Sequence, residues 1–123
     1  MQTPREVAES YWAAECTRDL QAVLDHYHAD AVVYPPDGQP LRGHDEIRTF
    51  YADELEEYPG LEVDIVHEVR NGSEASLEWE AVLVDKSGGR HPFRGVNVVR
   101  VRDGKFASVR AYFDPALIER TEP

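Results

Sequence analysis

The hydrophobic pattern of this chain changes from a helical period to a strand period near Leu61, and this change limits the folds that it can adopt. Before Leu61, apolar residues recur three and four positions apart, as in "DLQAVLDHY". From Leu61 onward they alternate with polar residues, as in "LEVDIVHEV". Helices followed by a run of strands predict an α+β fold.

Three segments before Leu61 are predicted helices. "TPREVAESYWAAEC" begins with a capping box, in which Thr3 caps the helix and Glu6 completes the box. In "DLQAVLDHY", Tyr27 falls on the apolar face, and in "HDEIRTFYADELEEY" Tyr51 points inward. The short strand "AVVYP" stops at Pro35, and "PDGQPLRG" is a predicted loop.

Four strands are predicted after Leu61: "LEVDIVHEV", "EASLEWEAVLVD", "HPFRGVNVVRV" and "KFASVRAYF". Asn71–Gly72 and Asp103–Gly104 are hairpin turns, and Asp114–Pro115 indicates the start of a short terminal helix. A curved sheet wrapped around helices leaves a cone with an apolar mouth, which is a natural pocket for a small molecule.

Composition excludes several classes of partner. The 123 residues fit one domain, 1–123, and the net charge of −11 argues against nucleic acid, which needs clustered Lys and Arg. No apolar run is long enough to span a membrane, and "MQTPREVAESYW" does not have the pattern of a signal peptide. Cys16 is the only cysteine, so no internal disulfide forms and we expect a cytoplasmic location.

Asn97 is the unusual residue of the third predicted strand. In "GVNVVRV", one face carries Asn97, Val99 and Val101, and the other carries the charge of Arg100. The first face is therefore the buried one. A buried amide without partners costs about 1–3 kcal/mol, so Asn97 needs a hydrogen-bonding role.

Four stretches carry a resemblance to a known family: "YWAAECTRDLQAVLDHYHADAVV", "GQPLRGHDEIRTFY", "GVNVVRVRDGK" and "VRAYFD". Together they resemble the nuclear-transport-factor-2-like superfamily, in its ketosteroid isomerase and SnoaL-like cyclase branch. The resemblance covers nearly the whole chain. It implies a cone-shaped α+β barrel, in which three N-terminal helices pack in a strongly curved mixed or antiparallel sheet.

The resemblance also implies an oxyanion hole. The isomerases hold their dienolate with a tyrosine that matches Tyr11, supported by tyrosines that match Tyr27 and Tyr51. Their partner aspartic acid matches Asn97. An amide NH₂ donates at any pH, so Asn97 would do this work without a raised pKa. Each tyrosine has the alternative role of a core residue, and Asn97 that of an amide bonded within the protein.

The general base of the isomerases is missing, because Pro35 occupies its position. Three residues are candidate replacements. Asp114 ends the last strand, where SnoaL-like members often use an acid, although it also suits an N-cap. Asp37 follows Pro35 closely, although "PPDG" is also an ordinary turn. His67 falls on the apolar face of "LEVDIVHEV" and has a suitable unperturbed pKa, although buried histidines are commonly structural.

The related limonene epoxide hydrolases are a weaker match, because their Arg-x-Asp pair aligns with Trp79 and Ala81. The predicted apolar lining of the pocket consists of Leu77, Trp79, Val99 and Phe113.

The leading hypothesis is an isomerase or cyclase that transfers a proton alpha to a carbonyl on an apolar small molecule. The alternative is a non-catalytic ligand-binding or dimerisation domain of the same fold. No histidine has metal-ligand spacing, and no metal or organic cofactor is implied. The resemblance implies a homodimer through the outer sheet face, where apolar residues exceed what a solvated face needs. They are Val82, Val84, Val96 and Val98.

Overall fold

The computed structural model describes residues 2–116. The helices are α1 (Pro4–Cys16), α2 (Leu20–Leu24) and α3 (Gly43–Glu57). The strands are β1 (Tyr27–Tyr34), β2 (Leu41–Arg42), β3 (Gly60–Asn71), β4 (Glu74–Val84), β5 (Arg90–Arg102) and β6 (Lys105–Phe113). Among the described residues, no helix combines the length and the apolar character that crossing a membrane requires.

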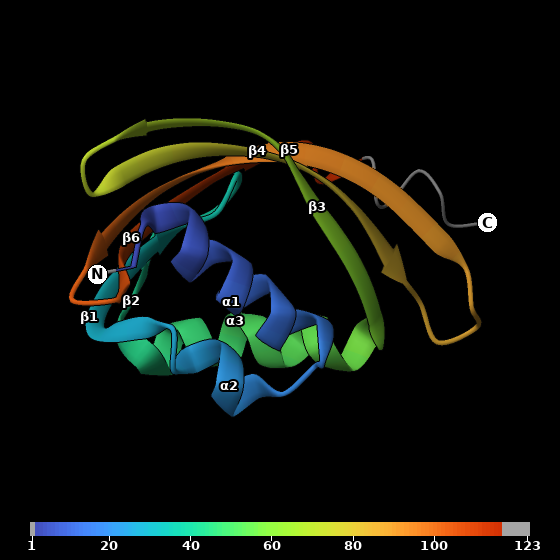
Figure 1. Cartoon of the computed structure of the whole chain (residues 1–123). Helices are drawn as coiled ribbons and strands as arrows, with labels where there is room; N and C mark the ends of the chain where they lie inside the picture. Colours follow the sequence, from blue (N-terminus) through green and yellow to red (C-terminus); the bar gives the residue numbers. More distant parts are fainter. Residues whose placement is uncertain (1, 117–123) are drawn as a thin grey trace.

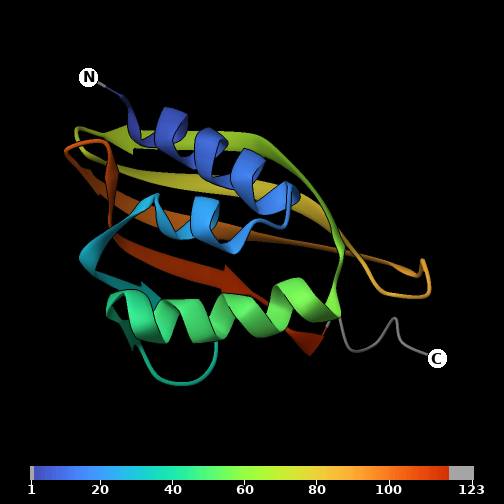
Figure 2. The same ribbon diagram turned by 90° about the horizontal axis from the view of Figure 1, so that it is seen from below.

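One mixed sheet arches over the helices (Figure 1). Its strand order is β2-β1-β6-β5-β4-β3, and β1 and β6 pair in parallel while the other pairs are antiparallel. Seen from below in Figure 2, α1 lies across the side of β3 and β4, and α3 lies across the side of β1. The predicted α+β architecture with a strongly curved sheet is therefore confirmed. The sheet ends at β2 and β3, so it is an open cone and not a closed barrel.

Helix α1 begins as its sequence predicts. The Glu6 amide donates to Thr3 Oγ1 at 3.1 Å, and the Thr3 amide donates to Glu6 Oε1 at 2.8 Å. This reciprocal capping box fixes where the helix starts. The buried residues of α1 are Pro4, Val7, Ala8, Tyr11, Trp12 and Glu15.

The second predicted helix is shorter than its pattern suggests. It ends at Leu24, and Tyr27 is the first residue of β1 instead of a helical residue. The Phe106 amide donates to the His26 carbonyl at 2.8 Å, and Tyr27 pairs with Phe106 in the sheet. Pairing with β6 therefore makes Tyr27 part of a strand, although the helical period of the sequence extends to this residue. The Tyr27 side chain is nonetheless 1% exposed, so its predicted burial is correct.

Two further predictions of local structure need comment. The predicted loop after Pro36 contains β2, whose Leu41 and Arg42 pair with Val33 and Val32. The terminal helix predicted after Asp114–Pro115 falls on residues 117 and onward, which lie outside the described residues.

A β-bulge in β3 changes the position of His67. Ile65 pairs with Trp79 and His67 pairs with Glu78, so Val66 is the extra residue between them. A bulge of this kind reverses the alternation of side chains that follow it. His67 is exposed as a result, and its predicted place on the apolar face beside Ile65 is wrong.

Candidate active site

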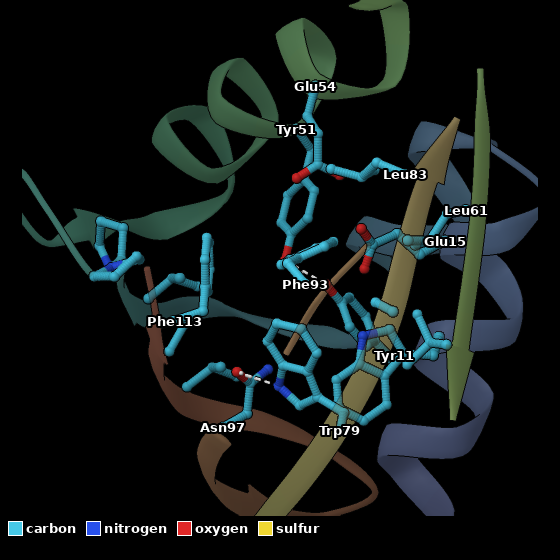
Figure 3. Close-up of a pocket in the computed structure, with 18 of the residues that line it drawn as sticks. Tyr11, Glu15, Tyr51, Glu54, Leu61, Trp79, Leu83, Phe93, Asn97 and Phe113 are labelled. Carbon is cyan, nitrogen blue, oxygen red and sulfur yellow. Dashed lines mark hydrogen bonds between the residues drawn. The ribbon is translucent and has the colours of Figure 1, made fainter. Parts of the chain in front are cut away.

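A pocket of about 100 Å³ lies between the concave face of the sheet and helices α1 and α3 (Figure 3). Its lining extends from the core, where Tyr11 is 5% exposed, to Phe50, which is 37% exposed. Most of this lining is aromatic or aliphatic. The lining residues with polar side-chain atoms are Tyr11, Trp12, Glu15, Tyr51, Glu54, Trp79 and Asn97.

Three buried tyrosines form a hydrogen-bonded network at the pocket. The Tyr51 hydroxyl lies at its centre, 2.5 Å from the Tyr11 hydroxyl and 2.8 Å from the Tyr27 hydroxyl. Burial raises the pKa of all three phenols, and for Tyr11 the nearby Glu15 carboxyl raises the pKa further. The tyrosines therefore keep their protons and act as neutral donors near neutral pH.

The partner of Asn97 is Trp79. The indole Nε1 of Trp79 donates to Asn97 Oδ1 at 3.1 Å (Figure 3). An indole nitrogen can only donate, so the atom facing it must be the amide oxygen, and the orientation of the amide is fixed. Among the described residues the Asn97 NH₂ has no acceptor, and the residue lines the pocket. The group available to a ligand is therefore a donor.

Two carboxyl groups also line the pocket, and sequence reasoning missed both. Glu15 lies on α1 and is 5% exposed, while Glu54 lies on α3. Arg18 contacts both: its Nη1 lies 4.0 Å from Glu15 Oε1, and its Nη2 lies 3.5 Å from Glu54 Oε2. The pocket thus has an acidic wall with one cation behind it.

The acidic wall holds Glu15 in an unusual state. Burial raises the pKa of Glu15 well above its ordinary value, and the neighbouring Glu54 carboxyl raises the pKa further. The Tyr11 hydroxyl and the Arg18 cation oppose this change only in part. Carboxyls with strongly raised pKa values in clefts are typical of acid–base sites.

The structure brings together some of the predicted site residues but not all. Tyr11, Tyr51, Trp79, Asn97 and Phe113 line the pocket. Tyr27 does not line the pocket, but its hydroxyl bonds Tyr51 and its ring packs against Tyr11. The other two predicted lining residues, Leu77 and Val99, are 0% and 1% exposed and belong to the core instead of the pocket wall.

None of the three predicted replacement bases lines the pocket. Asp37 is exposed, since it follows Pro35 and Pro36 around the turn and away from the cavity that both prolines line. Asp114 is exposed, and its Oδ1 accepts from the Ala116 amide at 3.0 Å, as a capping residue does. His67 points outward because of the bulge in β3.

Metal-ligating side chains are not grouped in the part of the chain that the structure describes. Within residues 2–116 no three His, Cys, Asp or Glu side chains lie close enough together to hold an ion.

Solved structures share this fold along almost their whole length. An NTF2-like protein of unknown function from Burkholderia pseudomallei is 20% identical, with 98% of each chain covered and a TM-score of 0.83. A protein with a ketosteroid isomerase-like fold from Catenulispora acidiphila, in complex with trimethylamine, is 18% identical, with 98% of this chain and 93% of that chain covered and a TM-score of 0.84. A candidate polyketide cyclase from Xanthomonas campestris is 20% identical, with 97% and 96% covered and a TM-score of 0.82.

A comparison with curated proteins gave no match. The family model of the SnoaL-like domain, in contrast, matches residues 8–109. That range contains α1 from Ala8 onward, all of the pocket's tyrosines, Asn97 and Trp79, and the solved structures share the same cone. The chain therefore belongs to the SnoaL-like domain family.

Proposed function

We propose that this protein is an enzyme that moves a proton next to the carbonyl group of an apolar small molecule bound in the pocket. Removal of such a proton places negative charge on the carbonyl oxygen. Donors aimed at that oxygen in an apolar site stabilise the charge, and one such donor contributes about 2.7–4 kcal/mol to the transition state. Tyr11 and Asn97 are the proposed donors.

The hydrogen bond between Trp79 and Asn97 carries this proposal. It occupies the amide oxygen and leaves the amide NH₂ for the ligand. The Tyr51 hydroxyl supports the second donor, because it bonds the Tyr11 hydroxyl and bonds Tyr27 in turn. The two donors share a pocket whose other walls are largely apolar, including Phe93 and Phe113.

The presence of Glu15 and Glu54 in the same pocket favours an enzyme over a binding domain. A site that only holds a ketone or phenol needs donors and an apolar wall. Carboxyl groups lining such a site add a desolvation cost that binding alone does not require. Membership of the SnoaL-like family and the cyclase named among the similar structures agree with this preference.

The experiment that tests the proposed donors is a titration with equilenin and naphthol, followed by fluorescence. Phenols of this kind resemble the enolate, because their oxygen carries partial negative charge on an aromatic ring. We expect binding to the parent protein, and about a tenfold or larger loss of affinity in Tyr11→Phe and in Asn97→Ala. The matched control is Tyr34→Phe, which removes a phenol that lies outside the pocket, beside Arg110.

Absence of binding, or equal binding by all variants, would show that Tyr11 and Asn97 do not form an oxyanion hole. Binding that depends on both donors, together with no proton exchange on any ketone tested, would support the ligand-binding domain instead.

We also propose that two copies of the chain pair through the outer face of the sheet. This face carries Tyr112, which is 57% exposed, together with the half-buried Val82, Val84, Val96 and Val98.

A further inference from the structure

We infer that Glu15 and Glu54 together transfer the proton in this pocket, Glu54 as the base and Glu15 as the acid, with Arg18 positioning both. This inference rests on the proposed function and adds the residues that move the proton. Both glutamates line the pocket, so both can touch a bound substrate. Arg18 does not line it and acts only through them.

Helical spacing ties each acid to the tyrosine network. Glu15 follows Tyr11 by four residues on α1, and Glu54 follows Tyr51 by three residues on α3. Residues so spaced lie on the same face of a helix. The two helices that present the tyrosines to the pocket therefore also present the acids. In the view of Figure 3, Glu15 and Glu54 lie on the side of the pocket opposite Asn97.

Arg18 adopts a conformation that non-glycine residues rarely take. Its φ of 61° lies in the left-handed region, just after the end of α1. Backbone strain of this kind gathers at functional sites. Here it returns the guanidinium to the helix end, where Nη1 donates to the Glu15 carbonyl oxygen at 3.1 Å. The same guanidinium contacts both carboxyl groups and is largely buried.

The cluster also leaves polar atoms unsatisfied. Among the described residues, Glu54 Oε2 and the Nε and Nη2 atoms of Arg18 are buried without a hydrogen bond. Buried polar atoms are paired in the great majority of cases, and exceptions point to a functional role. Glu54 Oε2 is therefore held by an ion pair with Arg18 Nη2 at 3.5 Å but not by a hydrogen bond, so it retains the capacity to accept a proton.

The charges of the cluster balance when the two carboxyl groups share one proton. Two ionised carboxyl groups and one guanidinium would leave an excess negative charge in a mostly apolar wall. Arg18 lies nearer to Glu54 (3.5 Å) than to Glu15 (4.0 Å), and the Glu54 side chain is 28% exposed against 7% for Glu15, so this geometry favours Glu54 as the charged partner and Glu15 as the holder of the proton. The raised pKa of Glu15 agrees with this assignment. The other titratable groups whose pKa values are raised by burial and also by Glu15 are Tyr11, Tyr27, Tyr51 and Cys16, and these raised pKa values keep them neutral near neutral pH.

The reaction then balances without a co-reactant. The Glu54 carboxylate takes a proton from the carbon beside the carbonyl, and the C–H electron pair becomes the new C=C bond. The carbonyl π pair moves to the oxygen held by Tyr11 and Asn97. Glu15 next gives its proton to a second carbon, a C–H bond forms there, and the oxygen regains its double bond to carbon. The pair again holds one proton, now on Glu54, and transfer between the two carboxyl groups restores the starting state.

The test uses cyclohex-3-enone, whose isomerisation to the conjugated cyclohex-2-enone is followed by ultraviolet absorbance. Exchange of hydrogen for deuterium on the same ketone in heavy water, followed by NMR, measures proton removal by the base alone. We expect Glu54→Gln to lower both rates by about a hundredfold, within the range for general bases. Glu15→Gln should lower the isomerisation by a similar factor and the exchange by less. Glu9→Gln and Glu57→Gln, exposed acids on the same two helices, are the matched controls.

Arg18 needs a readout that a merely structural role would not change. Removing its charge in Arg18→Gln favours protonated carboxyl groups, so the rising limb of the pH–rate profile should move to higher pH. Arg18→Lys should return the limb toward its original position. A change in rate without a shift of the profile would overturn the positioning role of Arg18.

The outcomes separate this inference from the proposed function. Naphthol binding that depends on Tyr11 and Asn97, with Glu15 and Glu54 variants as active as the controls, overturns the acid pair and leaves the donors standing. Loss of naphthol binding and of all turnover in the parent protein overturns both. If a glutamate variant does not fold, infrared spectroscopy of the parent protein with isotope-labelled glutamate tests whether the two carboxyl groups share a proton. A protonated carboxyl stretch at neutral pH supports the shared proton, and its absence overturns it.

Discussion

Trp79 and Asn97 are diagonal neighbours on adjacent strands, and Gly95 lies directly opposite the tryptophan. Trp79 on β4 pairs with Gly95 on β5, and Asn97 is two residues further along β5. The indole therefore lies over Gly95 and reaches the Asn97 amide oxygen at 3.1 Å. One cross-strand arrangement thus decides which end of the amide a ligand meets.

Removing the indole nitrogen should release the Asn97 amide. In Trp79→Phe the amide oxygen loses its donor, and the amide can turn its oxygen toward the ligand. We expect the affinity for naphthol to fall about tenfold and the free energy of unfolding to fall by about 1–3 kcal/mol. Calorimetric titration and chemical unfolding measure the two quantities.

Trp12→Phe is the comparison for this variant. Trp12 is the other tryptophan of the chain, and it lines the same pocket without a hydrogen bond to Asn97. It should lower the affinity less than Trp79→Phe does. Equal losses in the two variants would mean that ring packing, and not amide orientation, sets the affinity.

Gly95 should tolerate no side chain. A Cβ at this position would lie 2.4 Å from the Tyr112 carbonyl oxygen, 2.8 Å from Phe113 Cβ and 2.8 Å from Trp79 Cζ2. The first two atoms belong to the backbone or are fixed to it, so the strands or the indole must move. We expect Gly95→Ala to destabilise the fold by about 1–3 kcal/mol, as overpacking does, and to weaken naphthol binding. Thermal unfolding and titration check this, and an unchanged melting temperature would refute it.

Tyr51 should contribute more to stability than either tyrosine that it joins. Its hydroxyl bonds both Tyr11 and Tyr27, so Tyr51→Phe leaves two buried phenols without that partner. We expect a loss of about 1–3 kcal/mol in unfolding free energy, and a smaller loss in Tyr27→Phe, which ends the chain of hydroxyls. Naphthol affinity should fall less in Tyr51→Phe than in Tyr11→Phe. A larger fall would indicate that Tyr51 itself contacts the ligand.

The fold was accessible from the sequence because its signals are local and repeated. The capping box at Thr3, the change of period at Leu61 and the hairpin turns each specify an element without reference to distant residues. Tyr27 and His67 were misplaced for the opposite reason. Pairing with Phe106 drew Tyr27 into a strand, and a bulge at Val66 turned His67 outward, and both events depend on a partner strand.

The candidate site was only half visible in the sequence. Alternation predicted the burial of Asn97, and the resemblance supplied Tyr11 and Tyr51. Glu15 had a readable signal, because its spacing of four from Tyr11 puts an acid on the buried face of α1. Glu54 had a similar signal, because it lies three residues after Tyr51 and seven after Ile47, but the exposed acids around it hid that signal. The contacts that join Glu54 and Glu15 through Arg18 arise only in the tertiary structure.

The protein should be less stable in acid, because Asp85 then becomes protonated. The buried His91 ring bonds Asp85 Oδ2 at 2.7 Å, and Ser87 and Gly89 donate to Oδ1. These hydrogen bonds hold the pKa of Asp85 below its ordinary value, and the bond to His91 has the largest effect. A lowered pKa in the folded state adds stability that is present above the unfolded value of about 3.9 and is lost as pH falls below it. The parent protein should therefore have a higher melting temperature than Asp85→Asn at neutral pH. The difference between the two melting temperatures should disappear in strong acid.

Asp45→Asn is the control for the acid dependence. The Asp45 side chain is 99% exposed and pairs only with Arg48, so its gap in melting temperature should be small at every pH. A gap for Asp85→Asn that stays constant as the pH falls would contradict the role assigned to Asp85.

The outer sheet face should control assembly. Val98 lies within this face, on β5 beside β4 and β6, where it pairs with Ser76 and Arg110. Burying a charge there without a partner opposes association, so Val98→Asp should convert the proposed dimer to a monomer in sedimentation equilibrium.

Val69→Asp is the control, because Val69 is 60% exposed near the β3–β4 hairpin. The net charge of −11 repels two copies, so added salt should strengthen the dimer of the parent protein. A parent protein that sediments as a monomer in high salt would rule out this interface.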